Sequence, residues 1–223
     1  MASSDISTEH TLSSLIPLVE LCQLHDLPLT QEKLKQFEHY LELLLRFNRS
    51  MNLIGPMDAH DVVEELLCDS IMPTTQAPPT GTILDIGTGA GLPGIPLKIL
   101  YPESAITLVE PRKKRASFLR IVVSKLSLDN AEILNARLED TENLGHDYVI
   151  SKAFQPPKTW IETALGVLSP TGKIACMTRA SVQPELDAHA ASLGLQQSHA
   201  IPGYTTTRDG VDDRTTYIYT RTP

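Results

Sequence analysis

The sequence predicts an α/β protein: a mostly parallel seven-stranded sheet with an antiparallel edge, preceded by N-terminal helices. Three observations indicate this fold class. Short apolar runs alternate with helix-like segments from about residue 82 onward, the rhythm of strand-helix-strand crossover units. The first third of the chain has a helical periodicity instead. The last two apolar runs have no helix between them, which favours antiparallel pairing.

The N-terminal third is predicted to contain at least two helices. Thr30 can cap a helix whose apolar residues recur every three or four positions over residues 34–45. An upstream apolar pattern over residues 12–19 predicts another helix, in which Pro17 marks either the first turn or a break.

A third helix and a linker follow. Either Asp58 or Asp61 can begin the helix. Residues 73–81 are rich in proline and threonine and are expected to form a linker. We therefore predict an N-terminal helical segment over residues 1–75 and a second domain over residues 80–223.

Seven short segments rich in apolar and β-branched residues are expected to be strands. They cover residues 82–86, 105–110, 131–135, 148–151, 173–178, 196–201 and 215–220. Because helix-like segments separate most of the first five, these strands should be parallel and covered on both faces. The last two, joined by a polar stretch, should form the antiparallel edge.

Composition favours a soluble globular protein, with 41% apolar and 21% charged residues over 223 positions. Cys22, Cys68 and Cys176 lack any Cys-x-x-Cys spacing, so we expect neither disulfides nor a metal site. No apolar run reaches the roughly 20 residues of a membrane span, and residues 1–10 lack the pattern of a secretory signal. We expect a cytoplasmic monomer.

The net charge of −8 is concentrated in one part of the chain. Residues 1–75 hold 4 basic and 12 acidic side chains, and the remainder holds 15 of each. Because phosphate binding depends on where the positive field lies, the acidic total does not exclude a nucleic-acid partner.

A glycine-rich turn follows the first expected strand. After Asp85 come Gly87, Gly89 and Gly91 at alternate positions, and a helix is expected next. Glycines let the backbone adopt positive φ angles and approach a ligand closely. This turn suits the aminoacyl part of S-adenosylmethionine, which has no pyrophosphate to bind at a helix N-terminus.

Other nucleotide ligands fit the turn less well. A dinucleotide fingerprint requires Gly89, Gly91 and Gly94, which places Pro93 inside the motif and shifts it away from the strand. A P-loop is excluded because Gly-Lys-Ser/Thr is missing. Glu110 ends the second expected strand, where a carboxylate can accept hydrogen bonds from ribose hydroxyls. Together these features predict a Rossmann-like class I methyltransferase that binds S-adenosylmethionine.

Four cations follow Glu110 at the start of the next expected helix: Arg112, Lys113, Lys114 and Arg115. Positive charge there opposes the helix dipole by about 0.3–1 kcal/mol per residue. Residues 95–125 hold seven basic and two acidic side chains. The four cations from Arg112 to Arg115, called the basic strip below, can bind phosphates. The alternative is a solvated helix end paired with nearby carboxylates.

The chain resembles the RsmG family, also called glucose-inhibited division protein B, from about residue 28 to the end. The resemblance rests on the motif at residues 85–97, Asp-Ile-Gly-Thr-Gly-Ala-Gly-Leu-Pro-Gly-Ile-Pro-Leu, and on shorter matches that include Asp69-Ser70 and residues 151–154. It implies methylation of N7 of one guanine in bacterial small-subunit ribosomal RNA, either naked or in a partly assembled subunit.

Carried over by position, the resemblance implies cofactor contacts at Gly87, Leu92, Leu138, Glu139 and Lys152. Leu138 and Glu139 would lie beside the adenine. The chain departs from the family pattern at three places, which affect RNA affinity or target choice more than cofactor binding. Lys152 replaces an arginine, residues 65–66 replace an Arg-His pair, and Thr178 replaces a lysine.

The N7 atom of guanine has a free lone pair at neutral pH, so no general base is expected, and alignment can supply most of the catalysis. Lys152 can hold the target nucleotide, and Phe154 can either stack on the base or belong to the core. Phosphate contacts are expected from the basic strip, Arg137 and Arg214. Two other functions remain open: methylation of a small metabolite or protein, and cofactor binding without catalysis.

Overall fold

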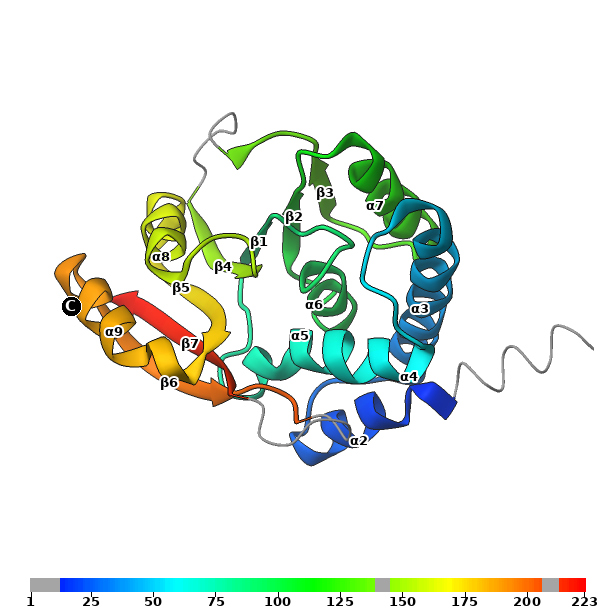
Figure 1. Cartoon of the computed structure of the whole chain (residues 1–223), viewed down its shortest axis with the longest axis horizontal. Helices are drawn as coiled ribbons and strands as arrows, with labels where there is room; N and C mark the ends of the chain where they lie inside the picture. The colour runs from blue at the N-terminus through cyan, green and yellow to red at the C-terminus, as the bar shows by residue number, and fades with distance from the viewer. Residues whose placement is uncertain (1–12, 139–144, 206–212) are drawn as a thin grey trace, which may run out of the picture.

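The computed structural model describes residues 13–138, 145–205 and 213–223, and it contains one central sheet with helices on both faces (Figure 1). The strand order is β3-β2-β1-β4-β5-β7-β6. The strands are β1 (Thr82–Ile86), β2 (Ala105–Val109), β3 (Ala131–Leu134), β4 (His146–Lys152), β5 (Leu168–Arg179), β6 (Leu195–Pro202) and β7 (Arg214–Arg221).

The pairing confirms the expected sheet. Strands β1 to β5 are parallel to one another, and β7 lies antiparallel between β5 and β6. Strand β5 begins earlier than expected, at Leu168 rather than Lys173. The prediction missed this part because Pro170 and Gly172 are typical of turns.

The helices cover the two faces unequally. Those of the described residues are α2 (Ile16–Leu24), α3 (Gln31–Met51), α4 (Ala59–Val62), η1 (Val63–Cys68), α5 (Asp69–Ile71), η2 (Met72–Thr75), α6 (Gly94–Leu100), α7 (Lys113–Lys125), α8 (Pro157–Gly166), η4 (Ala180–Val182) and α9 (Gln183–Ser192). Helices α2 to α7 share a core with one face of the sheet, and α8 and α9 with the other. None of these helices has the length and apolarity needed to cross a membrane.

The N-terminal helices begin where their capping residues predict. The hydroxyl of Thr30 accepts a hydrogen bond from the backbone N–H of Lys33 at 3.3 Å and starts α3. Pro17 lies in the first turn of α2. Asp58, rather than Asp61, starts the third helix, because its carboxylate accepts the N–H of Asp61 at 2.9 Å. The expected linker is partly helical, since η2 extends to Thr75.

A buried apolar cluster packs against each face of the sheet. Phe37 and Leu44 of α3 belong to the same buried cluster as Ile83 and Tyr148 of the sheet. On the opposite face, Trp160 of α8 lies in a second cluster with neighbouring strand residues. Because β1 to β5 are parallel, their carboxyl ends all lie at one edge of the sheet. Ligands bind at this edge in open α/β sheets.

Candidate active site

The turn after β1 needs its glycines. Gly87, Gly89 and Gly91 have φ angles of 72°, 61° and 97°, all in the region that side chains disfavour. A Cβ atom on Gly87 would lie 2.3 Å from the Cδ2 atom of Phe154. Gly89 is more open, because the nearest atom to such a Cβ is Nη1 of Arg115, at 3.5 Å. The backbone of the turn is thus accessible at its middle glycine.

Asp85 fixes the conformation of this turn through hydrogen bonds. Its side chain is fully buried, and Oδ2 accepts hydrogen bonds from the Thr88 hydroxyl and from the Gly94 N–H, the latter at 2.8 Å. The other oxygen, Oδ1, has no hydrogen-bond partner among the described residues. Burial raises the pKa of Asp85 to about 7, against the lowering effect of its two hydrogen bonds.

The raised pKa of Asp85 predicts a pH-dependent stability. Between its ordinary value of 3.8 and about 7, the folded protein keeps a proton that the unfolded chain has lost. The free energy of unfolding should therefore fall as pH rises through this window, by up to about 1.4 kcal/mol per pH unit from this group. Asp85→Asn removes the titration.

Urea denaturation at about pH 5 and about pH 8 measures the effect. Wild type should lose more stability than Asp85→Asn between the two conditions. An equal loss in both proteins would contradict the assignment of the titration to Asp85.

Glu110 follows β2 and connects the turn to α7. The residue is 3% exposed. One oxygen accepts the N–H of Gly89 at 3.0 Å, and the other accepts the N–H of Arg112 at 2.7 Å. Because each carboxylate oxygen can accept more than one hydrogen bond, Glu110 can still accept ribose hydroxyls.

A cavity of about 280 Å³ lies beside the turn. Its lining consists of Ile86, Gly87, Val109, Pro111, Ala136, Arg137, Leu138 and Phe154. Leu138 and Gly87 thus line the same cavity. The rings of Phe154 and Trp160 lie nearly perpendicular to each other, with centroids 6.4 Å apart. Leu92 follows the turn and is buried. Glu139 lies outside the described residues.

The open glycine turn, the carboxylate beside it and this mainly apolar cavity fit S-adenosylmethionine. Backbone groups of the turn suit the aminoacyl part, the carboxylate of Glu110 suits the ribose, and apolar walls suit the adenine ring. Leu138 and Phe154 supply two of those walls.

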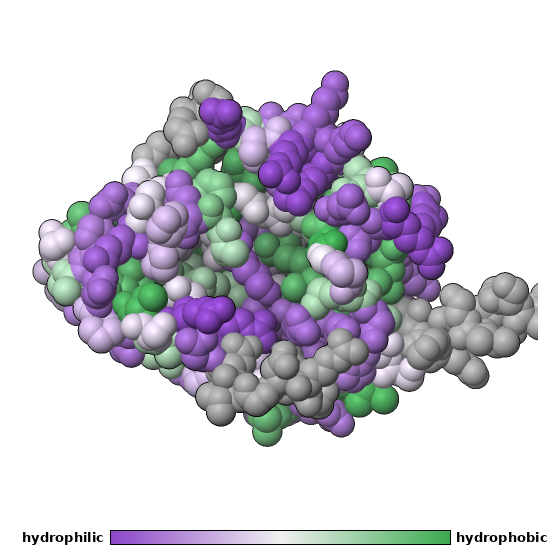
Figure 2. Space-filling view, in the orientation of Figure 1, coloured by the Kyte–Doolittle hydropathy of each residue, from purple (hydrophilic) through white to green (hydrophobic). Residues whose placement is uncertain are grey.

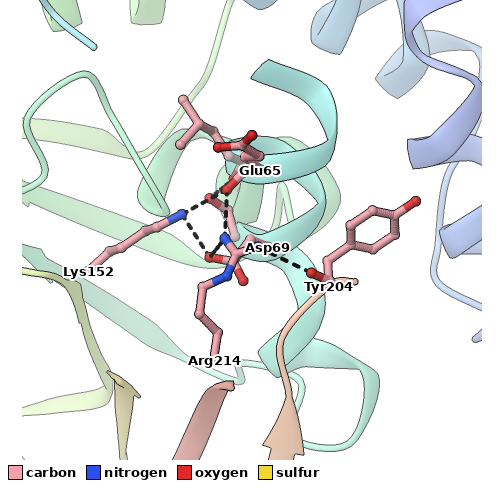
Figure 3. A network of polar contacts seen from close by, with 7 residues as sticks. Glu65, Asp69, Lys152, Tyr204 and Arg214 are labelled. Atoms are coloured by element: carbon pink, nitrogen blue, oxygen red, sulfur yellow. Dashed lines mark hydrogen bonds and ion pairs between the residues drawn. The ribbon is translucent and has the colours of Figure 1, made fainter. Parts of the chain in front are cut away.

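Lys152 points elsewhere, into a network with Asp69 and Arg214 (Figure 3). Its ammonium lies 2.7 Å from Oδ2 of Asp69 and donates to the Glu65 carbonyl at 3.1 Å. Nη1 of Arg214 lies 3.5 Å from the same Asp69 oxygen and donates to the same carbonyl at 3.3 Å. Nη2 of Arg214 donates to the Tyr204 carbonyl at 3.3 Å. The side chain of Asp69 is 4% exposed.

These two residues are placed differently from the other predicted site residues. Lys152 lines a second cavity, of about 200 Å³. Arg214 lines that second cavity too and is only partly exposed. The sequence indicated Asp69 only through the Asp69-Ser70 match to the family, and it did not predict the ion pairs of Asp69 with Lys152 and Arg214.

The basic strip lies on the surface beside the cofactor turn. Arg112, Lys113 and Lys114 are exposed, and Arg115 is half-buried near Gly89. Arg137 is exposed at the cofactor cavity. Hydrophilic side chains gather around the start of α7 in Figure 2, next to a hollow near the centre of that face.

The sheet order, the glycine turn after β1 and the carboxylate after β2 together define a Rossmann-like, S-adenosylmethionine-dependent methyltransferase. Solved structures of other proteins share this fold. Mitomycin 7-O-methyltransferase MmcR is 16% identical, with a TM-score of 0.58, over 82% of this chain and 60% of that one. TYW2 of M. jannaschii in complex with AdoMet is 16% identical, with a TM-score of 0.57, over 75% of this chain and 79% of that one.

Sequence comparison identifies the family. The model described as rRNA small subunit methyltransferase G (GidB) matches residues 33–208. Ribosomal RNA small subunit methyltransferase G of Oenococcus oeni is 33% identical over 179 residues, which cover 77% of this chain and 73% of that protein. The chain belongs to the rRNA small subunit methyltransferase G family.

Proposed function

We propose that this protein transfers the methyl group of S-adenosylmethionine to N7 of a guanine in small-subunit ribosomal RNA. One observation carries the proposal beyond the family assignment. The carboxylate of Glu110 joins the glycine turn to the basic strip, because it accepts the N–H groups of both Gly89 and Arg112. The proposed cofactor site and the surface suited to RNA phosphates are therefore adjacent.

The residues proposed to hold the cofactor come from three strand ends. They are Gly87, Gly89, Gly91 and Leu92 after β1, Glu110 after β2, and Leu138 and Glu139 after β3. When bound, S-adenosylmethionine supplies an activated methyl group: the N7 lone pair forms the new N–C bond while the C–S electron pair returns to sulfur. No proton moves, so the chain needs to bind, orient and exclude water rather than act as a base.

The basic strip is proposed to bind RNA backbone, together with Arg137. If Lys113 and Lys114 each neutralise one phosphate, Lys113→Ala with Lys114→Ala should reduce the slope of log affinity against log salt by about 1.4–1.8. Filter binding of small-subunit ribosomal RNA over a range of salt concentrations measures this slope.

The matched control is Lys158→Ala. Lys158 lies on α8, on the opposite face of the sheet, and forms an exposed ion pair with Glu185 at 3.0 Å. Its removal should leave the slope unchanged. An unchanged slope in the Lys113 and Lys114 double variant would place the RNA on another surface.

We also propose a cytoplasmic monomer in which residues 1–75 form a helical segment packed on the catalytic domain, residues 80–223. The shared core of α3 and the sheet supports the packing. The acidic excess of residues 1–75 would repel RNA from that segment and leave the basic strip as the approach.

Mapping of N7-methylguanine in small-subunit ribosomal RNA, from cells with and without the gene, tests the function. We expect loss of the modification at one guanine, and restoration by the wild-type gene. An unchanged map would reject the proposal and favour a metabolite or protein substrate, or binding without catalysis.

A further inference from the structure

We propose that the second cavity binds the target guanine base, with Lys152 donating a hydrogen bond to O6 and Asp69 positioning Lys152. This inference rests on the proposed function and deepens it. The cavity of about 200 Å³ includes Ala153, Met177 and Gly203 in its lining, with Lys152 and Arg214 beside them. Apolar walls with a few oriented polar groups suit a flat heterocycle.

The donor is available at the cavity. An ammonium has three N–H donors, and within the described part of the chain Asp69 and Glu65 accept two from Lys152. The Lys152 side chain is 22% exposed and lines the cavity. One donor therefore remains for a ligand, and its direction is restricted by the other two contacts.

Charge favours a base oxygen over a phosphate. The buried carboxylate of Asp69 lies within 4.0 Å of both cations, so these three side chains together carry one positive charge. Arg179 also lines the cavity, and its charge is offset by an ion pair with Asp213 at 3.9 Å. A phosphate is better served by cations without an adjacent carboxylate, such as those of the basic strip. A neutral carbonyl oxygen needs an oriented donor more than it needs net charge.

Methylation supplies a second reason for the carboxylate. Transfer to N7 leaves a positive charge on the guanine ring, and a nearby ammonium opposes that charge. Asp69 offsets this opposition while it keeps the ammonium in place. The turn after β4 also connects the two cavities, since Ala153 lines the base cavity and Phe154 lines the cofactor cavity.

The test pairs a protein group with a base atom. Small-subunit ribosomal RNA is prepared by ligation with guanine or 2-aminopurine at the mapped position, and is used naked or reconstituted, whichever the wild-type enzyme methylates. 2-Aminopurine keeps N7 and lacks O6. Wild type should prefer guanine by about 10- to 100-fold in kcat/KM, and Lys152→Ala should lose this preference.

Equilibrium affinity for the same two RNAs, measured without cofactor, gives a readout independent of turnover and should show the same pattern. Lys158→Ala serves as the control and should retain the wild-type preference. Asp69→Asn should weaken the preference and lower kcat more than it raises KM, with affinity for S-adenosylhomocysteine unchanged.

Three outcomes would overturn the inference. If Lys152→Ala keeps the preference for guanine, Lys152 does not contact O6. If Lys152→Ala weakens binding of the guanine and 2-aminopurine RNAs equally and reduces the slope of log affinity against log salt, Lys152 binds a phosphate. If Asp69→Asn keeps the full preference, Asp69 does not position the donor. Failure of wild type to methylate the guanine RNA would instead reject the proposed function.

Discussion

Gly87→Val is expected to abolish binding of S-adenosylmethionine. The φ angle of Gly87 is 72°, which a β-branched residue adopts only with strain of about 1–3 kcal/mol. Its Cβ would also lie 2.3 Å from the Phe154 ring, beside the cofactor cavity. Displacement of the turn or of the ring deforms the site, so we expect affinity to fall by at least about 100-fold, which corresponds to about 2.7 kcal/mol.

Isothermal titration calorimetry with S-adenosylmethionine measures this loss, and thermal unfolding checks that the variant is folded. Gly55→Val is the matched control, because a Cβ on Gly55 has no atom within 4 Å and its φ is not positive. It should bind the cofactor as wild type does. Wild-type affinity in Gly87→Val would remove the turn from the cofactor site.

Local patterns predicted the turn and the sheet well. Gly87, Gly89 and Gly91 all adopt the positive φ angles that their spacing indicates. The antiparallel edge followed from the missing helix between β6 and β7. Such features depend on residues close in sequence, where backbone sterics and strand periodicity act directly.

Contacts between distant segments were harder to predict. The family resemblance implies a cofactor contact for Lys152, but it does not indicate that the Lys152 ammonium contacts Asp69 of α5. Arg214 was expected at an RNA-binding surface and shares the same carboxylate. No spacing rule relates α5, β4 and β7, because only the assembled sheet brings their ends together.

Asp85 and Glu110 show the same limit within the cofactor site. Position along the strands indicated both carboxylates, but not that Asp85 would accept the Gly94 N–H or that Glu110 would join Gly89 to Arg112. Glu110 thus has two roles, one in the turn itself and one expected toward the ribose. A substitution that preserves its shape can separate them.

Glu110→Gln is expected to lower affinity for S-adenosylhomocysteine by about 10- to 100-fold. A hydrogen bond to a charged group contributes about 1.5–3 kcal/mol, and the amide keeps one acceptor oxygen while replacing the other with a donor. That donor would face either the Gly89 N–H or the Arg112 N–H, both of which now donate to the carboxylate. Calorimetry measures the affinity without any dependence on turnover.

A 2′-deoxy analogue of S-adenosylhomocysteine separates the ribose contact from damage to the turn. Wild type should bind the analogue more weakly than the parent compound, whereas Glu110→Gln should bind the two almost equally, because the acceptor for the missing hydroxyl has already been lost. Glu132→Gln, an exposed position on β3, is the control and should discriminate as wild type does. If Glu110→Gln binds both compounds weakly but keeps the wild-type ratio between them, its carboxylate shapes the turn and does not contact the 2′-hydroxyl.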